Sequence, residues 1–133
     1  MGIIARVPLA SGLLTGTIRA DSVFPLDDHR HFNRHGEQFD QGETFSGVPL
    51  DAALAAVDEL RALVPAGATL AQFALRWVLM WDAVTCVIPG AKRAAQVREN
   101  VAAGRLDALT EKTMTAARDV YDRLIRSHAH SRS

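Results

Sequence analysis

Two short apolar runs in the sequence predict β-strands. Residues 2–7 read GIIARV, and Val84–Ile88 read VTCVI. The second run is continuously apolar and β-branched, which favours a strand buried on both faces of a parallel sheet over a strand with one wet face. Pro89 and Gly90 end it. Because an apolar strand of this kind needs neighbours on its edges, both runs are expected to lie in a parallel sheet.

Apolar residues at helical spacing predict helices around the second strand. One helix is expected over residues 51–64, with Asp51 as its N-cap, and a last helix over residues 110–125, with Thr110 as its N-cap. Tyr121 lies on the apolar stripe of that last helix and is expected to be a packing residue. The predicted order is β, loop, α, α, β, α, α, which is two βα units.

A further helix is expected to begin at Thr69, because Gln72 follows three residues later at the spacing of a capping box. Apolar residues surround most of its circumference, so both Trp77 and Trp81 are expected in the core. Of its polar residues, we expect Gln72 and Arg76 to face outward.

After the second strand the pattern becomes helical from about Ala91 to Ala103, with Gly104 as the expected C-cap. Ala94, Val97 and Val101 share one face of this helix, while Gln96, Glu99 and Asn100 share another. Such a tight turn into a helix offers unpaired backbone N–H groups and the positive end of the helix dipole.

Lys92 and Arg93 add two cations at this helix start, which outlines a site for a phosphate. Gln96 and Asn100, four residues apart on one helix face, could hydrogen-bond a heteroaromatic base beside it. The alternative is that the cations form a solvated helix end and the amides a wet face.

Small residues dominate the segment after the first strand. Pro8–Gly16 reads PLASGLLTG, in which Gly12 and Gly16 would allow the backbone to approach a ligand closely. A structural turn without a ligand remains the alternative.

These two motifs together, PLASGLLTG and IPGAKRAAQVREN, resemble the C-terminal part of the aldo-keto reductases, which are NAD(P)H-dependent carbonyl reductases built on a (β/α)8 barrel. The resemblance covers nearly the whole chain. It implies an α/β fold that is a partial TIM barrel, comprising the seventh and eighth βα units with extra C-terminal helices. It also implies cofactor-binding roles for Leu9, Ser11, Gly12 and Leu14 at the pyrophosphate, for Gly90 and Lys92 at the phosphate turn, and for Gln96, Glu99 and Asn100 at the adenosine.

The resemblance implies NADPH as the cofactor, with NADH also open. Many members place an aromatic residue where this chain has Arg6, and lysine where it has Thr17. Some members read the adenosine 2′-phosphate with lysine and serine after the I-P motif, where Gly90 and Ala91 stand here. That role would fall to Lys92, with Arg93 as a second candidate.

The family's catalytic tyrosine, lysine, aspartate and histidine come from the first half of the barrel, so the resemblance implies that this chain has no catalytic residues. Tyr121, its only tyrosine, lies on the wrong side of the cofactor motif. The chain alone is predicted to be inactive and to self-associate or to need a complementary N-terminal half. The alternatives are a non-catalytic nucleotide-binding or regulatory module, oligomeric or not, and a helical protein-interaction domain, which would fail if the two strands pair in parallel.

Composition limits the other possibilities. A chain of 133 residues with 48% apolar residues can bury a core but falls short of the roughly 250 residues of a complete barrel. Fifteen basic residues balance fifteen acidic ones, which argues against nucleic acid or an anionic membrane as partner. No run approaches the roughly 20 apolar residues of a membrane span, so a cytoplasmic protein is expected. Cys86 is expected to be a buried thiol.

The chain is expected to form one unit over residues 1–126, with a long surface loop over residues 17–49 and a disordered tail over residues 127–133. His29, His31 and His35 in the loop match no recognised metal-ligand spacing. No metal site is therefore predicted.

Overall fold

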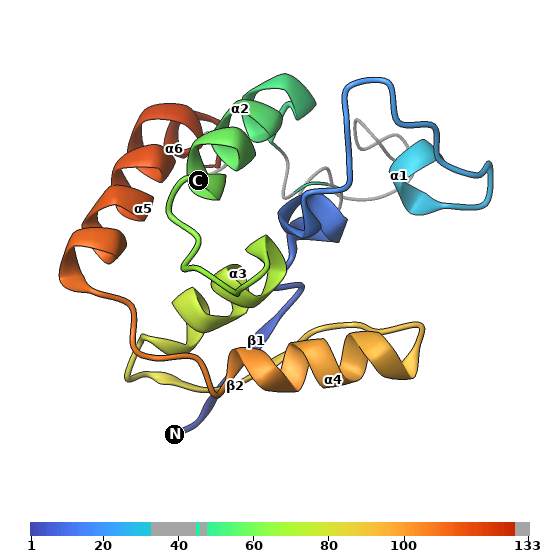
Figure 1. Ribbon diagram of the computed structural model, residues 1–133. Helices are drawn as coiled ribbons and strands as arrows, with labels where there is room; N and C mark the ends of the chain where they lie inside the picture. Colours follow the sequence, from blue (N-terminus) through green and yellow to red (C-terminus); the bar gives the residue numbers. More distant parts are fainter. Residues whose placement is uncertain (33–44, 46–47, 130–133) are drawn as a thin grey trace.

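The computed structural model describes residues 1–32, 45 and 48–129 (Figure 1). The elements are strand β1 (Ile3–Arg6), the 3-10 helix η1 (Ala10–Thr15), helices α1 (His29–Phe32), α2 (Leu50–Arg61) and α3 (Leu70–Leu79), strand β2 (Val84–Ile88), and helices α4 (Ala94–Ala103), α5 (Glu111–Leu124) and α6 (Arg126–Ala129). Among the described residues, the two predicted strands and four predicted helices follow in the predicted order, with η1, α1 and α6 in addition. β2 has the bounds that the sequence predicted.

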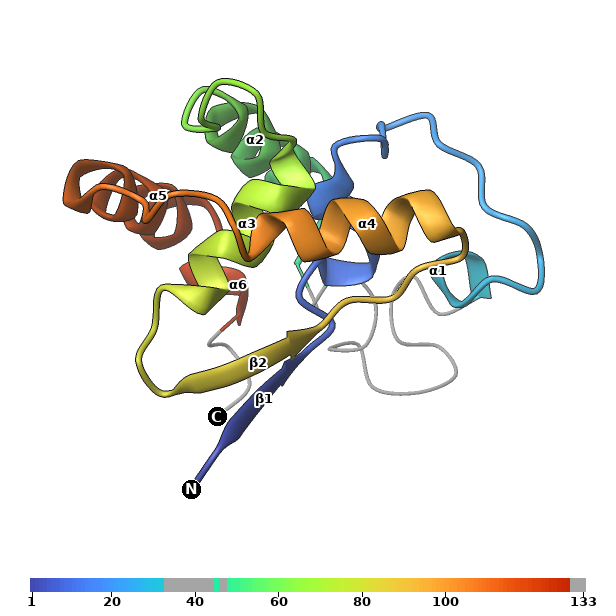
Figure 2. The same cartoon turned by 60° about the horizontal axis from the view of Figure 1, so that its bottom comes forward.

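The two strands form a parallel pair. Ile3 pairs with Val84 and Arg6 with Ile88, and the register is irregular between Ile3 and Ile4. This pairing excludes the interpretation as a purely helical interaction domain. Because both strands run in the same direction, the segments that follow them leave from the same end of the pair (Figure 2).

Helices α3 and α4 lie together on one side of the strand pair, as Figure 2 shows. α3 is the central element, because it contacts β2, α4 and η1. α2 and α5 pack against each other. A cluster of buried side chains joins α2, α3, α5 and the segment before α5: Val57, Leu70, Phe73, Leu109 and Ala117. This cluster fixes α3, and with it the positions of η1 and α4.

The strands are far less buried than the sequence predicted. Ile4 is 62% exposed and Ile88 is 56% exposed, while Cys86 is half-buried. Each strand has one hydrogen-bonded neighbour, and α3 and α4 lie on one side of the pair. The prediction of strands buried on both faces is therefore wrong for the described part of the chain.

The helix boundaries test the predicted caps. Thr69 and Gln72 form the capping box, with the Gln72 amide 3.1 Å from Thr69 Oγ1 and the Thr69 amide 3.0 Å from Gln72 Oε1. Thr110 Oγ1 accepts from the Thr113 amide at 3.2 Å. Both predictions are confirmed. The prediction for Asp51 is wrong, because α2 begins one residue earlier and Asp51 lies in its first turn, where its charge favours the helix dipole.

The polar residues of α3 do not simply face outward, as the sequence suggested. Gln72 Nε2 donates to the carbonyl of Glu99 at 3.1 Å, and Arg76 Nε donates to the carbonyl of Asp107 at 3.3 Å. The two side chains fasten α4 and the segment after it to α3. Sequence periodicity marks polar positions but not the distant carbonyls that they meet.

The aromatic side chains are also more exposed than predicted. Trp77 is partly buried and packs against the cluster around Phe73, whereas Trp81 is 38% exposed. The Arg118 guanidinium lies 5.3 Å from the Trp81 ring centroid. Tyr121 is 36% exposed. The prediction of a core role therefore holds for Trp77 but is wrong for Trp81, and Tyr121 of α5 is partly exposed.

Parts of the predicted loop and tail fall outside the described residues, including residues 33–44, 46–47 and 130–133 and thus His35. Within the described part, the loop contains helix α1 and the start of the tail forms α6. No group of His, Cys, Asp or Glu there could hold a metal ion. No helix among the described residues has the length and apolar character to cross a bilayer.

Candidate functional site

Two segments leave the same end of the strand pair and carry the predicted binding residues. We call residues 7–16, after β1, the glycine loop, and residues 89–93, after β2, the phosphate turn. η1, within the glycine loop, and α4, after the phosphate turn, both contact α3. Figure 2 shows η1 and α4 on one side of the molecule. The residues predicted for a nucleotide site lie in these two segments and in α4, which follows the phosphate turn.

The glycine loop has an unusual backbone. Val7, Ala10 and Ser11 have φ of 49°, 48° and 57°, and Gly12 and Gly16 have φ of 94° and 75°. Positive φ is uncommon outside glycine and costs about 1–3 kcal/mol per residue, and such residues cluster at functional sites. Three consecutive residues, 10–12, share this conformation. The loop therefore persists only because surrounding contacts hold it.

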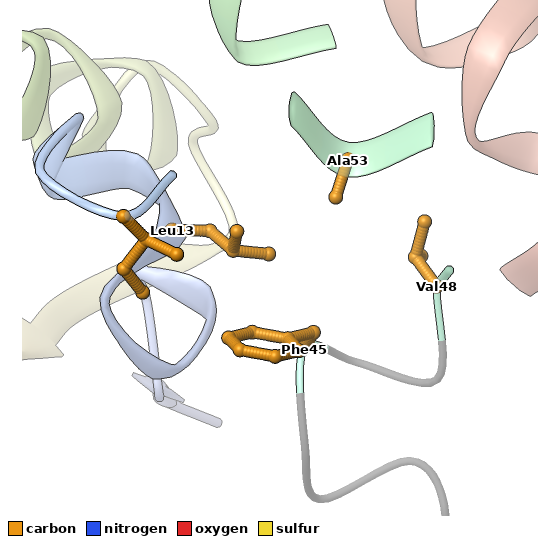
Figure 3. Close-up of a cluster of buried hydrophobic side chains, with 5 residues drawn as sticks. Leu13, Phe45, Val48 and Ala53 are labelled. Atoms are coloured by element: carbon orange, nitrogen blue, oxygen red, sulfur yellow. The ribbon is translucent and has the colours of Figure 1, made fainter. Parts of the chain in front are cut away.

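Packing and internal hydrogen bonds supply part of that support. The carbonyl of Leu9 accepts from the amides of Gly12 at 3.0 Å and Leu14 at 3.2 Å. The Leu14 side chain packs against the cluster between α2, α3 and α5. Leu13 is buried in a second cluster, shown in Figure 3, with Ile18, Phe45, Val48 and Ala53. The two leucines anchor the loop from beneath, so a ligand would meet its backbone rather than these side chains.

Two arginines contact the loop from outside. Arg30 Nη1 donates to the carbonyl of Ser11 at 3.5 Å, and Arg61 Nη2 donates to the carbonyl of Gly16. A Cβ atom on Gly16 would lie 2.8 Å from Arg61 Nη2, and one on Gly12 would lie 3.4 Å from Arg30 Nη1. The space beside these glycines, which was predicted to leave room for a ligand, is occupied here by guanidinium groups. Sequence reasoning missed both arginines, because they lie 19 and 45 residues from their partners and form no motif with them.

Arg30 is itself held firmly. Its Nε and Nη2 donate to the two oxygens of Asp28, at 2.9 and 2.6 Å, and its guanidinium lies 4.5 Å from the Phe24 ring centroid. The hydrogen bond with Asp28 raises the pKa of Arg30. Arg30 therefore stays charged and oriented toward the loop.

The phosphate turn is fastened by the amide side chains of α4. Gln96 Oε1 accepts from the amides of Lys92 at 2.8 Å and Arg93 at 3.1 Å. Asn100 Nδ2 donates to the carbonyl of Gly90 at 3.4 Å. These two side chains close the turn on the helix. Their contact with a base stays a prediction.

The faces of α4 are oriented opposite to the usual amphipathic arrangement. Gln96, Glu99 and Asn100 are half-buried, whereas Val97 and Val101 are 51% and 56% exposed. The amide side chains turn inward because they bond to the phosphate turn, and the backbone carbonyl of Glu99 accepts from Gln72 of α3. The helix ends at Gly104, the predicted C-cap.

Lys92 and Arg93 are the free cations of this site. Both are exposed, and neither side chain forms a hydrogen bond or ion pair with the residues that the structure describes. They precede α4, whose first backbone amides have no carbonyl partner within the helix. Two exposed charges beside the positive end of a helix dipole form an environment that favours a phosphate.

An apolar cavity of about 430 Å³ lies under the glycine loop. It is bounded by η1, α2, α3 and α5, and Leu14, Trp77 and Tyr121 line it. Tyr121 thus faces this cavity from α5. The cavity has few polar groups and belongs to the packing of the helices rather than to the phosphate turn.

Comparison with known proteins identifies the family. The model of the aldo/keto reductase family matches residues 1–122. The L-glyceraldehyde 3-phosphate reductase of Escherichia coli K12 is 40% identical over 121 residues, which cover 88% of this chain and 32% of the reductase. A probable voltage-gated potassium channel subunit beta of Arabidopsis thaliana is 35% identical, over 77% of this chain and 30% of that protein.

Solved structures agree. The glycerol dehydrogenase of Gluconobacter oxydans superposes with a TM-score of 0.72 at 30% identity, over 93% of this chain and 35% of the dehydrogenase. An aldo-keto reductase of Bacillus halodurans superposes with a TM-score of 0.55 at 21% identity, which supports the fold. The chain spans about a third of the length of these relatives. With its parallel strands and helices matching part of their barrel, the chain belongs to the aldo-keto reductase family.

Proposed function

We propose that this chain is the cofactor-binding, C-terminal part of an NADPH-dependent oxidoreductase that reduces aldehydes or ketones, without the catalytic half. The observation that supports this most strongly is the position of the glycine loop and the phosphate turn at one end of the parallel strand pair. In barrels of this class, ligands bind at the carboxyl ends of the strands.

The residues present fit a dinucleotide phosphate. Lys92 and Arg93 are exposed and free of ion pairs with described residues, and the Gly90 backbone has open space around its α-carbon. In this proposal Lys92 and Gly90 hold a phosphate, and the backbone of Leu9, Ser11, Gly12 and Leu14 lies along the pyrophosphate. The bound cofactor would supply the hydride.

The adenosine role proposed for α4 needs one adjustment. Gln96 and Asn100 already bond the phosphate turn. We propose that they shape the turn and contact the adenosine with the hydrogen-bonding groups that these bonds leave unused. Glu99 lies on the same half-buried face. NADPH is preferred over NADH because two uncommitted cations suit the additional 2′-phosphate.

A second function is favoured by one relative. The Arabidopsis protein is named as a potassium channel subunit, which fits a regulatory module that binds a nucleotide without reducing a carbonyl. This second function would be favoured if the chain binds NADPH, has a defined oligomeric state, and shows no turnover either alone or together with a complementary part of a reductase.

The two functions separate in a complementation experiment. The chain alone should bind NADPH but show no carbonyl-dependent NADPH oxidation. Coexpression with the remaining two-thirds of the Escherichia coli relative should restore oxidation if the chain is part of a reductase, with Lys92→Ala as the control that lowers it. Turnover by the chain alone would contradict the proposed absence of catalytic residues.

A further inference from the structure

We propose that Arg61 and Arg30 are positioning residues that hold the glycine loop in its left-handed conformation for a diphosphate. This inference rests on the proposed function, because it concerns the same cofactor site. It assigns a role to two side chains that neither motif contains.

Arg61 lies at the end of α2 and reaches the far end of the loop. Its Nη2 donates to the carbonyl of Gly16, and three of its guanidinium atoms would lie within 3.1 Å of a Cβ on that glycine. Its other partner, Asp58, is 3.7 Å away and 81% exposed, a pair that contributes little. The contact with Gly16 is therefore the principal one.

Arg30 makes the equivalent contact in the middle of the loop, on the carbonyl of Ser11. Asp28 and Phe24 fix its guanidinium before it reaches the loop. Between the two contacted carbonyls lie Gly12 and Leu14, two of the four residues that we propose to lie along the pyrophosphate. The middle and the far end of the loop are thus tied to different helices, Ser11 to α1 and Gly16 to α2.

The chemistry explains why arginine suits this role. A carbonyl oxygen carries the negative end of a peptide dipole and repels a nearby phosphate, and a guanidinium paired with it offsets that repulsion. The same contact opposes relaxation of the consecutive positive-φ residues, 10–12. Loss of either arginine should therefore weaken diphosphate binding more than adenosine binding.

The test compares two ligands by isothermal titration of the full chain. NADPH spans both segments, whereas adenosine 2′-monophosphate lacks the pyrophosphate. Arg61→Gln and Arg30→Gln should each lower the affinity for NADPH about fivefold, which is the effect of one charge-assisted hydrogen bond at a partly exposed site. Each should change the affinity for the monophosphate less than twofold. Arg61→Lys should recover part of the loss. Arg105→Gln, which removes an exposed charge outside both segments, should change neither affinity.

Equal losses for both ligands, or no loss for NADPH, would overturn the positioning role while leaving the proposed function intact. If the wild-type chain binds no NADPH, the proposed function fails, and amide hydrogen exchange then decides the structural part. Arg61→Gln should speed exchange at Gly12, Leu14 and Gly16, whose amides bond within the loop. Unchanged exchange at these amides would overturn the proposal that Arg61 holds the loop.

Discussion

The glycine loop and the phosphate turn leave the same end of the strand pair but are built in different ways. The glycine loop has positive φ angles, is anchored by the buried Leu13, and receives hydrogen bonds from Arg30 and Arg61 on distant segments. The phosphate turn is exposed and is held by Gln96 and Asn100 of the helix that follows it. One segment depends on tertiary structure, and the other depends on its own helix.

This difference teaches which changes each segment should tolerate. A loop held by burial and by long-range contacts should be sensitive to changes far from it in sequence. A turn held by its own helix should respond mainly to changes within about ten residues. The predictions below test this contrast by urea unfolding unless another measurement is named.

The largest effect is expected at the anchor of the glycine loop. Leu13→Ala removes a side chain that is 5% exposed and should lower the free energy of unfolding by about 2–4 kcal/mol, because it leaves a cavity in a packed cluster. Val97→Ala on α4, where valine is 51% exposed, should change it by less than about 0.5 kcal/mol. Similar losses for both variants would erase the contrast.

A smaller effect is expected at the glycines. Gly16→Ala places a Cβ against Arg61 at a φ of 75° and should destabilise the chain by about 1–2 kcal/mol. Gly67→Ala shares the positive φ but meets no atom within 4 Å, so it isolates the backbone contribution. Gly90→Ala, with neither feature, should be close to neutral. If Gly16→Ala lowers the free energy of unfolding no more than Gly67→Ala does, the Arg61 contact imposes no constraint on Gly16.

Within the phosphate turn, Gln96 is the residue to change. Gln96→Ala leaves the amides of Lys92 and Arg93 without their acceptor and should cost about 1 kcal/mol, as loss of an N-terminal cap does. Gln96→Glu keeps the acceptor and should retain stability. Its negative charge should nevertheless lower the affinity for NADPH, measured by titration. Retained NADPH affinity in the glutamate variant would argue against a phosphate at this turn.

The smallest effect concerns α2, the helix that carries Arg61. Hydrogen bonds from Arg123 of α5 lower the pKa of Glu59 of α2. A carboxylate whose pKa is lowered by folding stabilises the fold at pH values above its unfolded-state pKa of about 4.3. This stabilisation is lost as the pH falls through the folded-state pKa. The unfolding midpoint should therefore fall slightly more steeply below about pH 5 in the wild type than in Glu59→Gln. Parallel profiles would show that this exposed pair contributes nothing to docking of α2 on α5.

The local features of this fold were readable from the sequence because their signals lie within a few residues. β2 has its predicted bounds, and the capping box of Thr69 and Gln72 forms as predicted. The resemblance to the aldo-keto reductases, carried by two motifs, also proved correct. Strand, turn and helix chemistry is local, so periodicity and motifs suffice for it.

The remainder depended on tertiary contacts that no local pattern encodes. The burial of α4 is an example: its valines are exposed and its amide side chains face inward, because the phosphate turn provides partners for Gln96 and Asn100. Trp81 looked like a core residue from its stripe, yet no described element covers it fully. Arg30 and Arg61 carried no signal, because their partners are backbone carbonyls far along the chain.

In the proposed function, the glycine loop and the phosphate turn hold one dinucleotide together. The most direct test is a nitrogen-15 NMR titration of the chain with NADPH. Amide signals of Ser11 and Gly12 and those of Gly90 and Lys92 should shift along one binding curve with a single Kd, while the Gly67 amide stays unchanged. Shifts confined to one segment, two different curves, or no saturable change would contradict the claim.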